Sequence, residues 1–274
     1  PKRALVLAPT FAEYESALRC VDARIDYYKI NHGDFQVKPD ICGQIYPETD
    51  MVFLCNPNNP TGLLISENVL ASVLERCEAT DTWLGGDECF LEFVRQGETC
   101  SLIGELASRP KLIIIKSFTK MFGIAGLRLG YLLCGREGLG DMIDKYGCDW
   151  NVNCVAEAAG LEALRSPDYE KEVLHYVEKE REWLYDKLTG LELRVVPGQA
   201  NYLLFETPEN GRKTDRTDGS KSGRESLGDW LLRQGIMIRC CDDYENLDKT
   251  FYRIGINTHE ANEKLMEKIG EWLE

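Results

Sequence analysis

Short apolar runs alternate with segments of helical period along the first half of the chain. The runs predict strands at 4–8, 51–55, 83–86, 112–116 and 131–134. Between the second and third of these, apolar side chains recur at helical spacing from Val69 to Cys77, directly after Ser66, a favourable N-cap residue. This stretch predicts an amphipathic crossover helix. Such alternation is typical of an α/β fold with a mainly parallel sheet.

The pattern changes after Asn153. A long helical region is predicted from 155 to 188, then strands at 193–196, 202–205, 236–239 and 251–256, and a final amphipathic helix from about Glu260. We therefore expect a large domain over 1–160 and a smaller α+β domain over 161–274. The segment 209–225 is polar and contains several Gly and Ser residues, which predicts a surface loop.

The first residues, Pro1-Lys2-Arg3, lead at once into an apolar strand of the buried type. A domain rarely begins on an interior strand. We therefore expect that an N-terminal part of the large domain is missing from this sequence.

Composition and charge narrow the range of functions. The chain has 274 residues, with 46 acidic against 32 basic side chains and a formal net charge of −14, which disfavours binding to nucleic acid or to an anionic membrane surface. Its apolar runs are strand-sized, too short to span a bilayer. Eleven scattered cysteines without a C-x-x-C pair are unlike a disulfide framework and favour the reducing cytoplasm.

Candidate chemistry first emerges in the segment 111–131, KLIIIKSFTKMFGIAGLRLGY. Ser117, Lys120 and Arg128 follow its apolar run, and we expect them on one short loop and the structure after it. Burial or nearby positive charge can lower the pKa of a lysine amine and make it a nucleophile toward a carbonyl cofactor. An arginine fork can bond two phosphate oxygens together. The segment therefore predicts a phosphate site beside a reactive amine.

Two other interpretations fit this segment taken alone. Ser117-x-x-Lys120 has the spacing of the serine nucleophile motif of penicillin-binding enzymes, but neither companion triplet, S-D-N or K-T-G, occurs downstream. Lys120 also fits a solvated lysine at a strand end. The rest of the chain is needed to decide.

Polar residues follow two more predicted strands. NPNNPTG at 56–62 comes after the strand that ends at Cys55, and Asp87-Glu88 comes after the strand at 83–86. Taken singly, the first is typical of a tight turn and Asp87 of a cap. Because α/β sheets place ligands at the carboxyl ends of parallel strands, we expect the turn, the carboxylate and the Ser-Lys-Arg group to meet at one sheet edge.

In this order and spacing, NPNNPTG, GGDECFLEF and SFTKMFGIAGLRLGY resemble the fold-type-I aminotransferases that use pyridoxal phosphate. The resemblance covers essentially the whole chain and implies an α/β fold with a mainly parallel large domain and a smaller C-terminal domain. It implies that Lys120 bonds the cofactor covalently, that Asp87 pairs with the ring nitrogen and that Asn59 bonds the ring hydroxyl oxygen. Ser117 and Arg128 would hold the cofactor phosphate.

Four further segments resemble the threonine-phosphate decarboxylases of cobalamin biosynthesis more closely than the histidinol-phosphate aminotransferases. They are APTFAEYESAL at 8–18, Trp150 in DWNVN, PGQANYLLF at 197–205 and IMIRCCDDYENLDKTFYRIGI at 236–256. Phe90 replaces the tyrosine usual in the aminotransferases, as we expect in this subgroup. The resemblance implies decarboxylation of L-threonine O-3-phosphate to (R)-1-amino-2-propanol O-2-phosphate.

The same resemblance implies that Arg253 grips the substrate carboxylate and that Asn153 and Asn201 lie near the cofactor or the carboxylate. Arg253 also fits a surface arginine at a strand edge, and the two asparagines fit ordinary turn residues. Tyr14 fits either a position near the cofactor or a helix cap, and is not among the predicted site residues.

A small phosphorylated amino acid is the partner that the resemblance implies, with a homodimer as the assembly and no metal site. Two alternatives stay open. One is a histidinol-phosphate-type aminotransferase, and the other is a truncated chain without catalytic activity.

Overall fold

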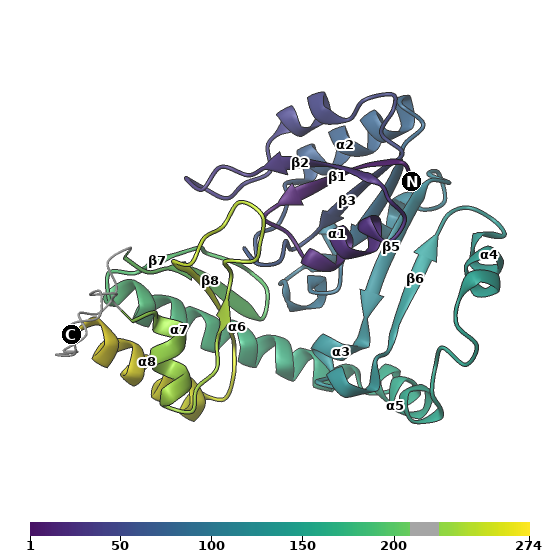
Figure 1. Cartoon of the computed structure of the whole chain (residues 1–274). Helices are drawn as coiled ribbons and strands as arrows, with labels where there is room; N and C mark the ends of the chain where they lie inside the picture. Colours follow the sequence, from purple (N-terminus) through teal and green to yellow (C-terminus); the bar gives the residue numbers. More distant parts are fainter. Residues whose placement is uncertain (209–224) are drawn as a thin grey trace.

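The computed structural model describes residues 1–208 and 225–274, and two sheets organise this part of the chain (Figure 1). The first sheet has the strand order β2-β1-β3-β4-β5-β6. Its strands are β1 (Arg3–Ala8), β2 (Arg24–Lys29), β3 (Met51–Cys55), β4 (Trp83–Asp87), β5 (Leu112–Ser117) and β6 (Gly130–Cys134). All neighbouring pairs are parallel except β5 with β6. The predicted α/β fold with a mainly parallel sheet is confirmed.

Different helices cover the two faces of this sheet. Leu5 and Leu7 of β1 pack in one core cluster with the apolar stripe of α2 (Glu67–Ala79). Ala4 and Val6 pack on the other face with α1 (Ala12–Arg19). Because both faces are buried, the central strands are apolar throughout rather than alternating, which is why they stand out in the sequence. Ser66 precedes α2 as predicted, although its side chain makes no capping hydrogen bond.

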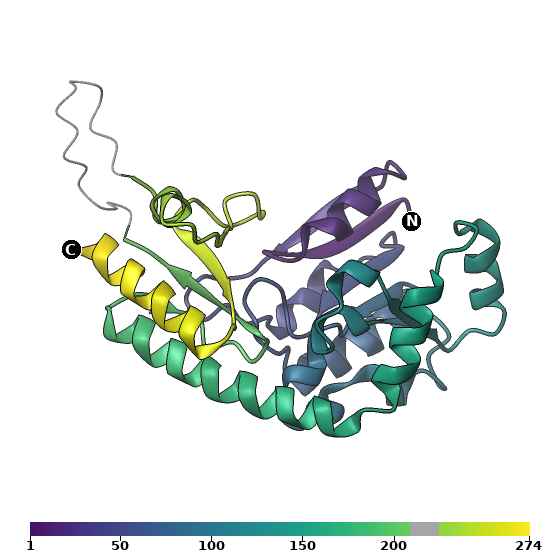
Figure 2. The same cartoon turned by 90° about the horizontal axis from the view of Figure 1, so that it is seen from below.

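The second sheet is antiparallel, with the order β7-β8-β10-β9. Its strands are β7 (Arg194–Val195), β8 (Tyr202–Glu206), β9 (Arg239–Cys240) and β10 (Phe251–Gly255). The helices α6 (Pro167–Gly190), α7 (Leu227–Arg233) and α8 (His259–Leu273) share a core cluster with β8 and β10. Figure 2 shows α6 extending from this sheet to the region below the first sheet.

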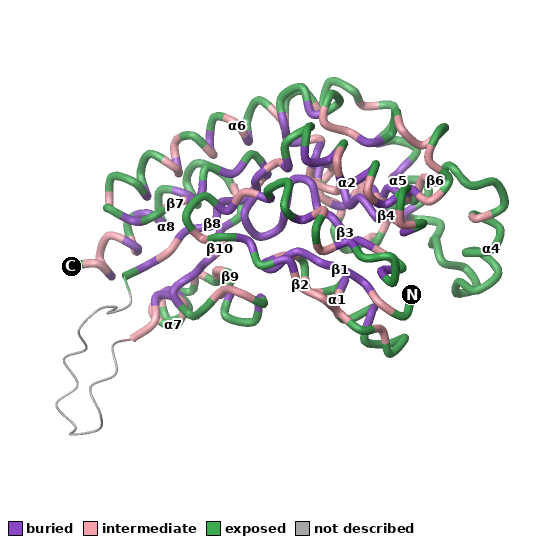
Figure 3. The backbone as a smooth tube through the Cα atoms, turned by 90° about the horizontal axis from the view of Figure 1, so that it is seen from above, coloured by how far each residue is buried: buried purple, intermediate pink, exposed green. Residues whose placement is uncertain are grey.

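The remaining elements are short. They are α3 (Phe118–Met121), α4 (Leu139–Tyr146), α5 (Cys154–Leu164) and the 3-10 turns η1 (Pro39–Gln44), η2 (Leu91–Phe93), η3 (Gly97–Cys100), η4 (Leu102–Glu105) and η5 (Ala125–Leu127). Figure 3 shows β1, β3, β4 and β8 as largely buried and α4 as exposed. No helix in the described ranges is both long and apolar enough to span a bilayer.

Several predicted elements differ from the structure. The helical region 155–188 is divided into α5 and α6, because Pro167 starts a new helix and Ser166 before it leaves the helical conformation (φ −116°, ψ 54°). The strand predicted at 236–239 shortens to β9, and β2, whose sequence RIDYYK has no apolar run, was not predicted. The predicted loop at 209–225 lies outside the described residues, apart from its last position.

The domain boundary near residue 160 stays a prediction. The two sheets do fall on either side of it. However, Val196, Leu204 and Phe251 of the second half belong to the same core cluster as Leu5 and Leu7 of the first. The two halves therefore share buried apolar surface.

Candidate active site

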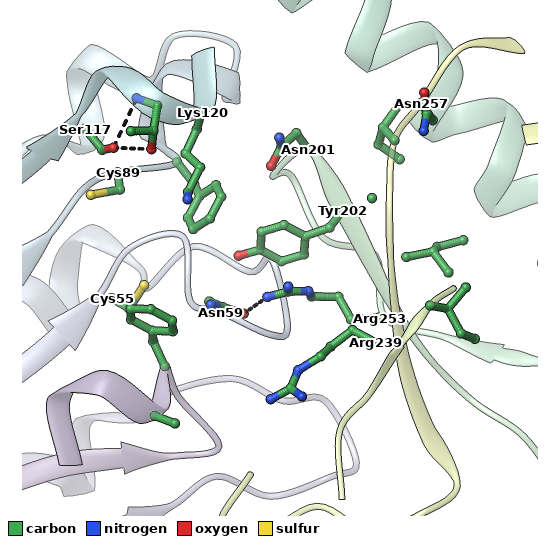
Figure 4. Close-up of a pocket in the computed structure, with 18 of the residues that line it drawn as sticks. Cys55, Asn59, Cys89, Ser117, Lys120, Asn201, Tyr202, Arg239, Arg253 and Asn257 are labelled. Atoms are coloured by element: carbon green, nitrogen blue, oxygen red, sulfur yellow. Dashed lines mark hydrogen bonds between the residues drawn. The ribbon is translucent and has the colours of Figure 1, made fainter. Parts of the chain in front are cut away.

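The carboxyl ends of β3, β4 and β5 meet at one edge of the first sheet. Cys55 pairs with Asp87, and Asp87 pairs with Ile115, two residues before Ser117. A cleft of about 1480 Å³ opens at this edge, and its other wall comes from the second sheet (Figure 4). Seven of the eight predicted site residues line this cleft: Asn59, Asp87, Ser117, Lys120, Arg128, Asn201 and Arg253. The sequence argument that strand ends would bring these groups together is therefore supported.

Lys120 lies in the short helix α3 that begins directly after β5. Ser117 caps this helix, because its Oγ accepts a hydrogen bond from the Thr119 amide at 3.2 Å. The Lys120 Nζ lies 5.7 Å from the centre of the Phe90 ring. Within the described residues, it makes no ion pair or hydrogen bond. Its amine is therefore a free group facing the cleft.

A second lysine, Lys116, also lines the cleft but is held by two acids. Its Nζ lies 3.0 Å from Glu92 Oε1 and 3.3 Å from Glu88 Oε2, and its side chain is buried. Burial alone would lower the pKa of Lys116, but the charges of Glu92 and Glu88 outweigh burial and raise it. Lys116 thus stays protonated and is a poor nucleophile.

Asp87 presents a buried carboxylate at the end of β4. Its Oδ2 accepts a hydrogen bond from the Tyr14 hydroxyl at 2.5 Å, and its Oδ1 accepts one from the Cys89 amide at 2.9 Å. Burial raises the pKa of Tyr14 well above its usual value, with Cys55 and Asp87 adding to the shift, so the hydroxyl remains a donor. Burial likewise raises the pKa of the Cys55 and Cys89 thiols beside it. The carboxylate is therefore held in place by neutral neighbours.

Asn59, on the turn after β3, meets Arg253, which lies on β10 of the opposite wall (Figure 4). Arg253 Nη1 donates to Asn59 Oδ1, and the Tyr244 hydroxyl donates to the same oxygen at 3.3 Å. The guanidinium also lies over the Tyr202 ring, 5.1 Å from its centre. Because Oδ1 is occupied, the Asn59 amide nitrogen is the end available as a donor to a ligand.

The loop that carries Asn59 is fixed by a close approach of two backbones. Gly62 has φ +70°, and a Cβ at this position would lie 3.0 Å from Gly198 Cα. Only glycine fits such a position without strain. This contact joins the 56–62 turn to the segment before β8.

Arg128 follows α3 in the chain, and its backbone has an unusual conformation. Its φ of 56° is in the left-handed region, which is uncommon for a residue with a side chain. Its Nη1 donates to the Ala125 carbonyl at 3.2 Å, and the side chain is exposed at the cleft. A strained residue of this kind is often found at functional sites.

The structure does not bring Asn153 to the cleft. It caps α5, because its Oδ1 accepts from the Ala156 amide at 2.9 Å, and its Nδ2 donates to the Leu127 carbonyl at 3.3 Å. Its proposed substrate contact stays a prediction. Asn201, by contrast, lines the cleft.

Sequence reasoning missed three residues of this cleft. Tyr14 holds Asp87, Tyr244 holds Asn59, and Arg239 lies directly opposite Arg253 across the β9–β10 pair. Arg239 was within a predicted strand, so an arginine in an otherwise apolar run was an available signal. A position of Tyr14 near the cofactor was considered but not predicted, and nothing local in the sequence marks Tyr244.

The groups in the cleft fit pyridoxal phosphate. This cofactor offers an aldehyde for a free amine, a ring nitrogen for a buried carboxylate, a ring oxygen for an amide donor, and a phosphate for a hydroxyl and a guanidinium. The free amine is that of Lys120, the buried carboxylate that of Asp87 and the amide donor that of Asn59. The hydroxyl and the guanidinium are those of Ser117 and Arg128. All five side chains line one cleft.

Comparison with known proteins agrees with this geometry. The family model described as aminotransferase class I and II matches residues 1–269. The chain is 34% identical over 271 residues to the threonine-phosphate decarboxylase of Salmonella typhimurium, covering 98% of this chain and 70% of that protein. It is 32% identical over 270 residues to the histidinol-phosphate aminotransferase of Methanothermobacter thermautotrophicus, covering 97% and 67%.

A solved structure shows the same architecture. The histidinol-phosphate aminotransferase of Clostridium acetobutylicum superimposes with a TM-score of 0.88 at 27% identity, covering 99% of this chain and 78% of that one. The chain therefore belongs to the class I and II aminotransferases, a family of enzymes that use pyridoxal phosphate.

Proposed function

We propose that the protein to which this chain belongs decarboxylates L-threonine O-3-phosphate to (R)-1-amino-2-propanol O-2-phosphate, with pyridoxal phosphate as the cofactor. The observation behind this is a cleft in which a free lysine amine faces two arginines. Arg239 and Arg253 are paired across neighbouring antiparallel strands, and both line the cleft that holds Lys120. The similarity to a protein named threonine-phosphate decarboxylase, at 34% identity, supports the same choice.

The paired arginines favour a substrate with two anionic groups. Like charges directly opposite each other on a sheet are destabilising. Arg239 is partly neutralised by Asp243, whose Oδ2 lies 2.6 Å from its Nη2. Among the described residues, Arg253 bonds only the neutral Asn59 and Tyr244. A carboxylate on Arg253 and a phosphate near Arg239 would remove the remaining repulsion. A phosphorylated amino acid brings both groups.

Each side chain then has a physical task. Pyridoxal phosphate, when bound, supplies an electron sink for the carbanion at the substrate's α carbon. Lys120 supplies the amine that attaches the cofactor, and Asp87, held by Tyr14, keeps the ring nitrogen protonated. Ser117 and Arg128 hold the cofactor phosphate. Asn59 donates from its amide nitrogen, the end that Arg253 leaves available.

Decarboxylation depends in this proposal on substrate orientation. A bidentate clamp on the carboxylate fixes which bond of the α carbon is aligned for cleavage. Arg253 is itself anchored by Asn59, a residue of the cofactor site, so substrate and cofactor positions are coupled. No further catalytic group is required to select the carboxylate as the group that leaves.

The first test is a visible absorption titration of the purified chain with pyridoxal phosphate, run beside Lys120→Ala. A yellow band that Lys120→Ala cannot form is the expected result. Lys264 is a matched control, because it lines the same cleft but is exposed, so Lys264→Ala should keep the band. Equal bands in all three proteins would show that Lys120 is not the attachment site.

Product analysis separates the remaining alternatives. With O-phospho-L-threonine, release of carbon dioxide without any 2-oxo acid supports the decarboxylase. A requirement for a 2-oxo acid would instead support a histidinol-phosphate-type aminotransferase, which the similarity at 32% identity also favours. A chain that forms no specific band and turns nothing over would be the non-catalytic form.

We also propose a cytoplasmic homodimer. All eleven cysteines lie in the described part of the chain and are free, which supports a reducing compartment. Large apolar side chains are exposed around α4 and α5, including Tyr146 at 81% and Trp150 at 94%, which supports a covered face. Sedimentation equilibrium of the purified protein tests the dimer, and a monomer at all concentrations would contradict it.

A further inference from the structure

One buried oxygen in the cleft wall has no hydrogen-bond partner among the described residues. The Asn201 Oδ1 is buried, and no hydrogen bond to it is found in the described residues. The Asn201 backbone is well held, because its carbonyl accepts from the Ile256 amide at 2.8 Å, so the side chain is not needed to fix the segment before β8. Buried amide oxygens nearly always have a partner, and the exceptions call for an explanation.

The position of Asn201 suggests what the partner is. The side chain lines the cleft beside Tyr202, and in Figure 4 its oxygen faces the side of the cleft that holds Lys120. Its neighbours differ from it in this respect. Asn59 Oδ1 accepts from Arg253 and Tyr244, and Asn257 Oδ1 accepts from the Thr258 amide at 2.8 Å. Asn201 is thus the acceptor that a ligand has to satisfy.

We propose that Asn201 Oδ1 accepts a hydrogen bond from the amine of the amino-acid substrate. This inference rests on the proposed function, because it takes a phosphorylated amino acid as the ligand. A carboxylate and a phosphate dianion offer only acceptors, so the amine is the one N–H donor that such a ligand brings. Asn201 therefore selects for the amine, while the arginines select for the two anions.

The test compares wild type with Asn201→Leu, which is similar in size and has no polar atom. Both proteins are loaded with pyridoxal phosphate and titrated by rapid mixing, before the first turnover, with O-phospho-L-threonine and with 3-phosphooxybutanoate, which lacks the amine. We expect Asn201→Leu to raise the dissociation constant of O-phospho-L-threonine about 10-fold, as for the loss of one charge-assisted hydrogen bond. The dissociation constant of 3-phosphooxybutanoate should stay within about twofold.

A second readout separates a ligand contact from a structural role. Removing a buried polar atom that lacks a partner should leave the melting temperature of the ligand-free protein unchanged or raise it. Asn262→Leu is the matched control, because Asn262 lines the same cleft but is fully paired: its Nδ2 donates to Glu180 at 2.9 Å and its Oδ1 accepts from the Asn257 amide at 3.2 Å. This control should lower the melting temperature.

Three results would overturn the inference. They are an equal loss of affinity for both ligands, no loss for either, and failure of the wild-type protein to bind either ligand. Failure of the proposed function is seen separately, since the Lys120-dependent band and carbon dioxide release are measured on a protein in which Asn201 is intact. A protein that binds O-phospho-L-threonine through Asn201 without releasing carbon dioxide would refute the decarboxylase alone.

Discussion

Tyr14→Phe isolates one hydrogen bond at the centre of the site. The phenol ring of Tyr14 stacks on Phe53, with centroids 5.3 Å apart and an interplanar angle of 3°, and phenylalanine can keep this packing. Only the hydroxyl, 2.5 Å from Asp87 Oδ2, is removed. The change therefore tests whether the hydroxyl, rather than the ring, holds the carboxylate.

The expected loss follows from burial and charge. Asp87 is 8% exposed, so solvent has little access to replace the hydroxyl. A hydrogen bond to a charged group contributes about 1.5–3 kcal/mol, and an O–H···O⁻ bond of this length lies in the strong range. We expect the free energy of unfolding of the cofactor-free protein to fall by about 2 kcal/mol, and pyridoxal phosphate to bind about 10-fold more weakly because Asp87 is less well oriented.

Urea unfolding at neutral pH, followed by tryptophan fluorescence, measures the first effect, and the absorption titration measures the second. Tyr131→Phe is the control, since Tyr131 is 44% exposed and its hydroxyl makes no hydrogen bond in the described part of the chain. That control should change stability by less than about 0.5 kcal/mol. If Tyr14→Phe behaves like Tyr131→Phe, the hydroxyl does not hold the carboxylate and the argument fails.

Three further changes test other parts of the site and core. Arg253→Lys keeps the positive charge but loses the planar guanidinium group that can bind a carboxylate with two hydrogen bonds. We expect kcat/KM for O-phospho-L-threonine to fall about 10- to 100-fold, while cofactor affinity changes less than about threefold. Equal kinetics would contradict a carboxylate clamp. Gly62→Ala places a Cβ against Gly198 at positive φ and should lower the free energy of unfolding by about 1–3 kcal/mol, measured by urea unfolding. Burial raises the pKa of Cys77 and Cys241 to about 12. In the unfolded chain these thiols ionise near pH 8.5. The free energy of unfolding should therefore be unaffected below this pH and should fall above it by about 1.4 kcal/mol per pH unit per thiol. Urea midpoints that stay constant from pH 7 to about 10 would refute this.

The sheet and the location of the site were predictable because they depend on short segments. Each central strand is an apolar run, and each polar group directly follows such a run, so the carboxyl-end rule alone places Asn59, Asp87 and Ser117 together. β2 was missed because it is an edge strand with a mixed sequence. The break at Pro167 was missed because helical segments lie on both sides of it and only two residues separate them.

Contacts between distant segments could not be predicted from the sequence. Tyr14 and Asp87 are 73 residues apart, and Asn59 and Arg253 are 194 residues apart, so no local spacing indicates that they bond. Asn153 is a different case, because a local role is visible for it. Asparagine is a favoured N-cap residue, and this local role accounts for its side-chain oxygen without any ligand.

Two of the lysines that line the cleft, Lys116 and Lys120, show what the structure adds to the sequence. Lys116 and Lys120 are four residues apart in one motif, and composition alone does not distinguish them. The structure distinguishes them through acids elsewhere: Glu88 and Glu92, which follow β4, keep Lys116 charged, while no acid pairs with Lys120 in the described residues. The carboxylates of Glu88 and Glu92 hold the Lys116 amine as a cation, and a cationic amine does not attack a carbonyl, so the position of these carboxylates removes Lys116 as a candidate nucleophile.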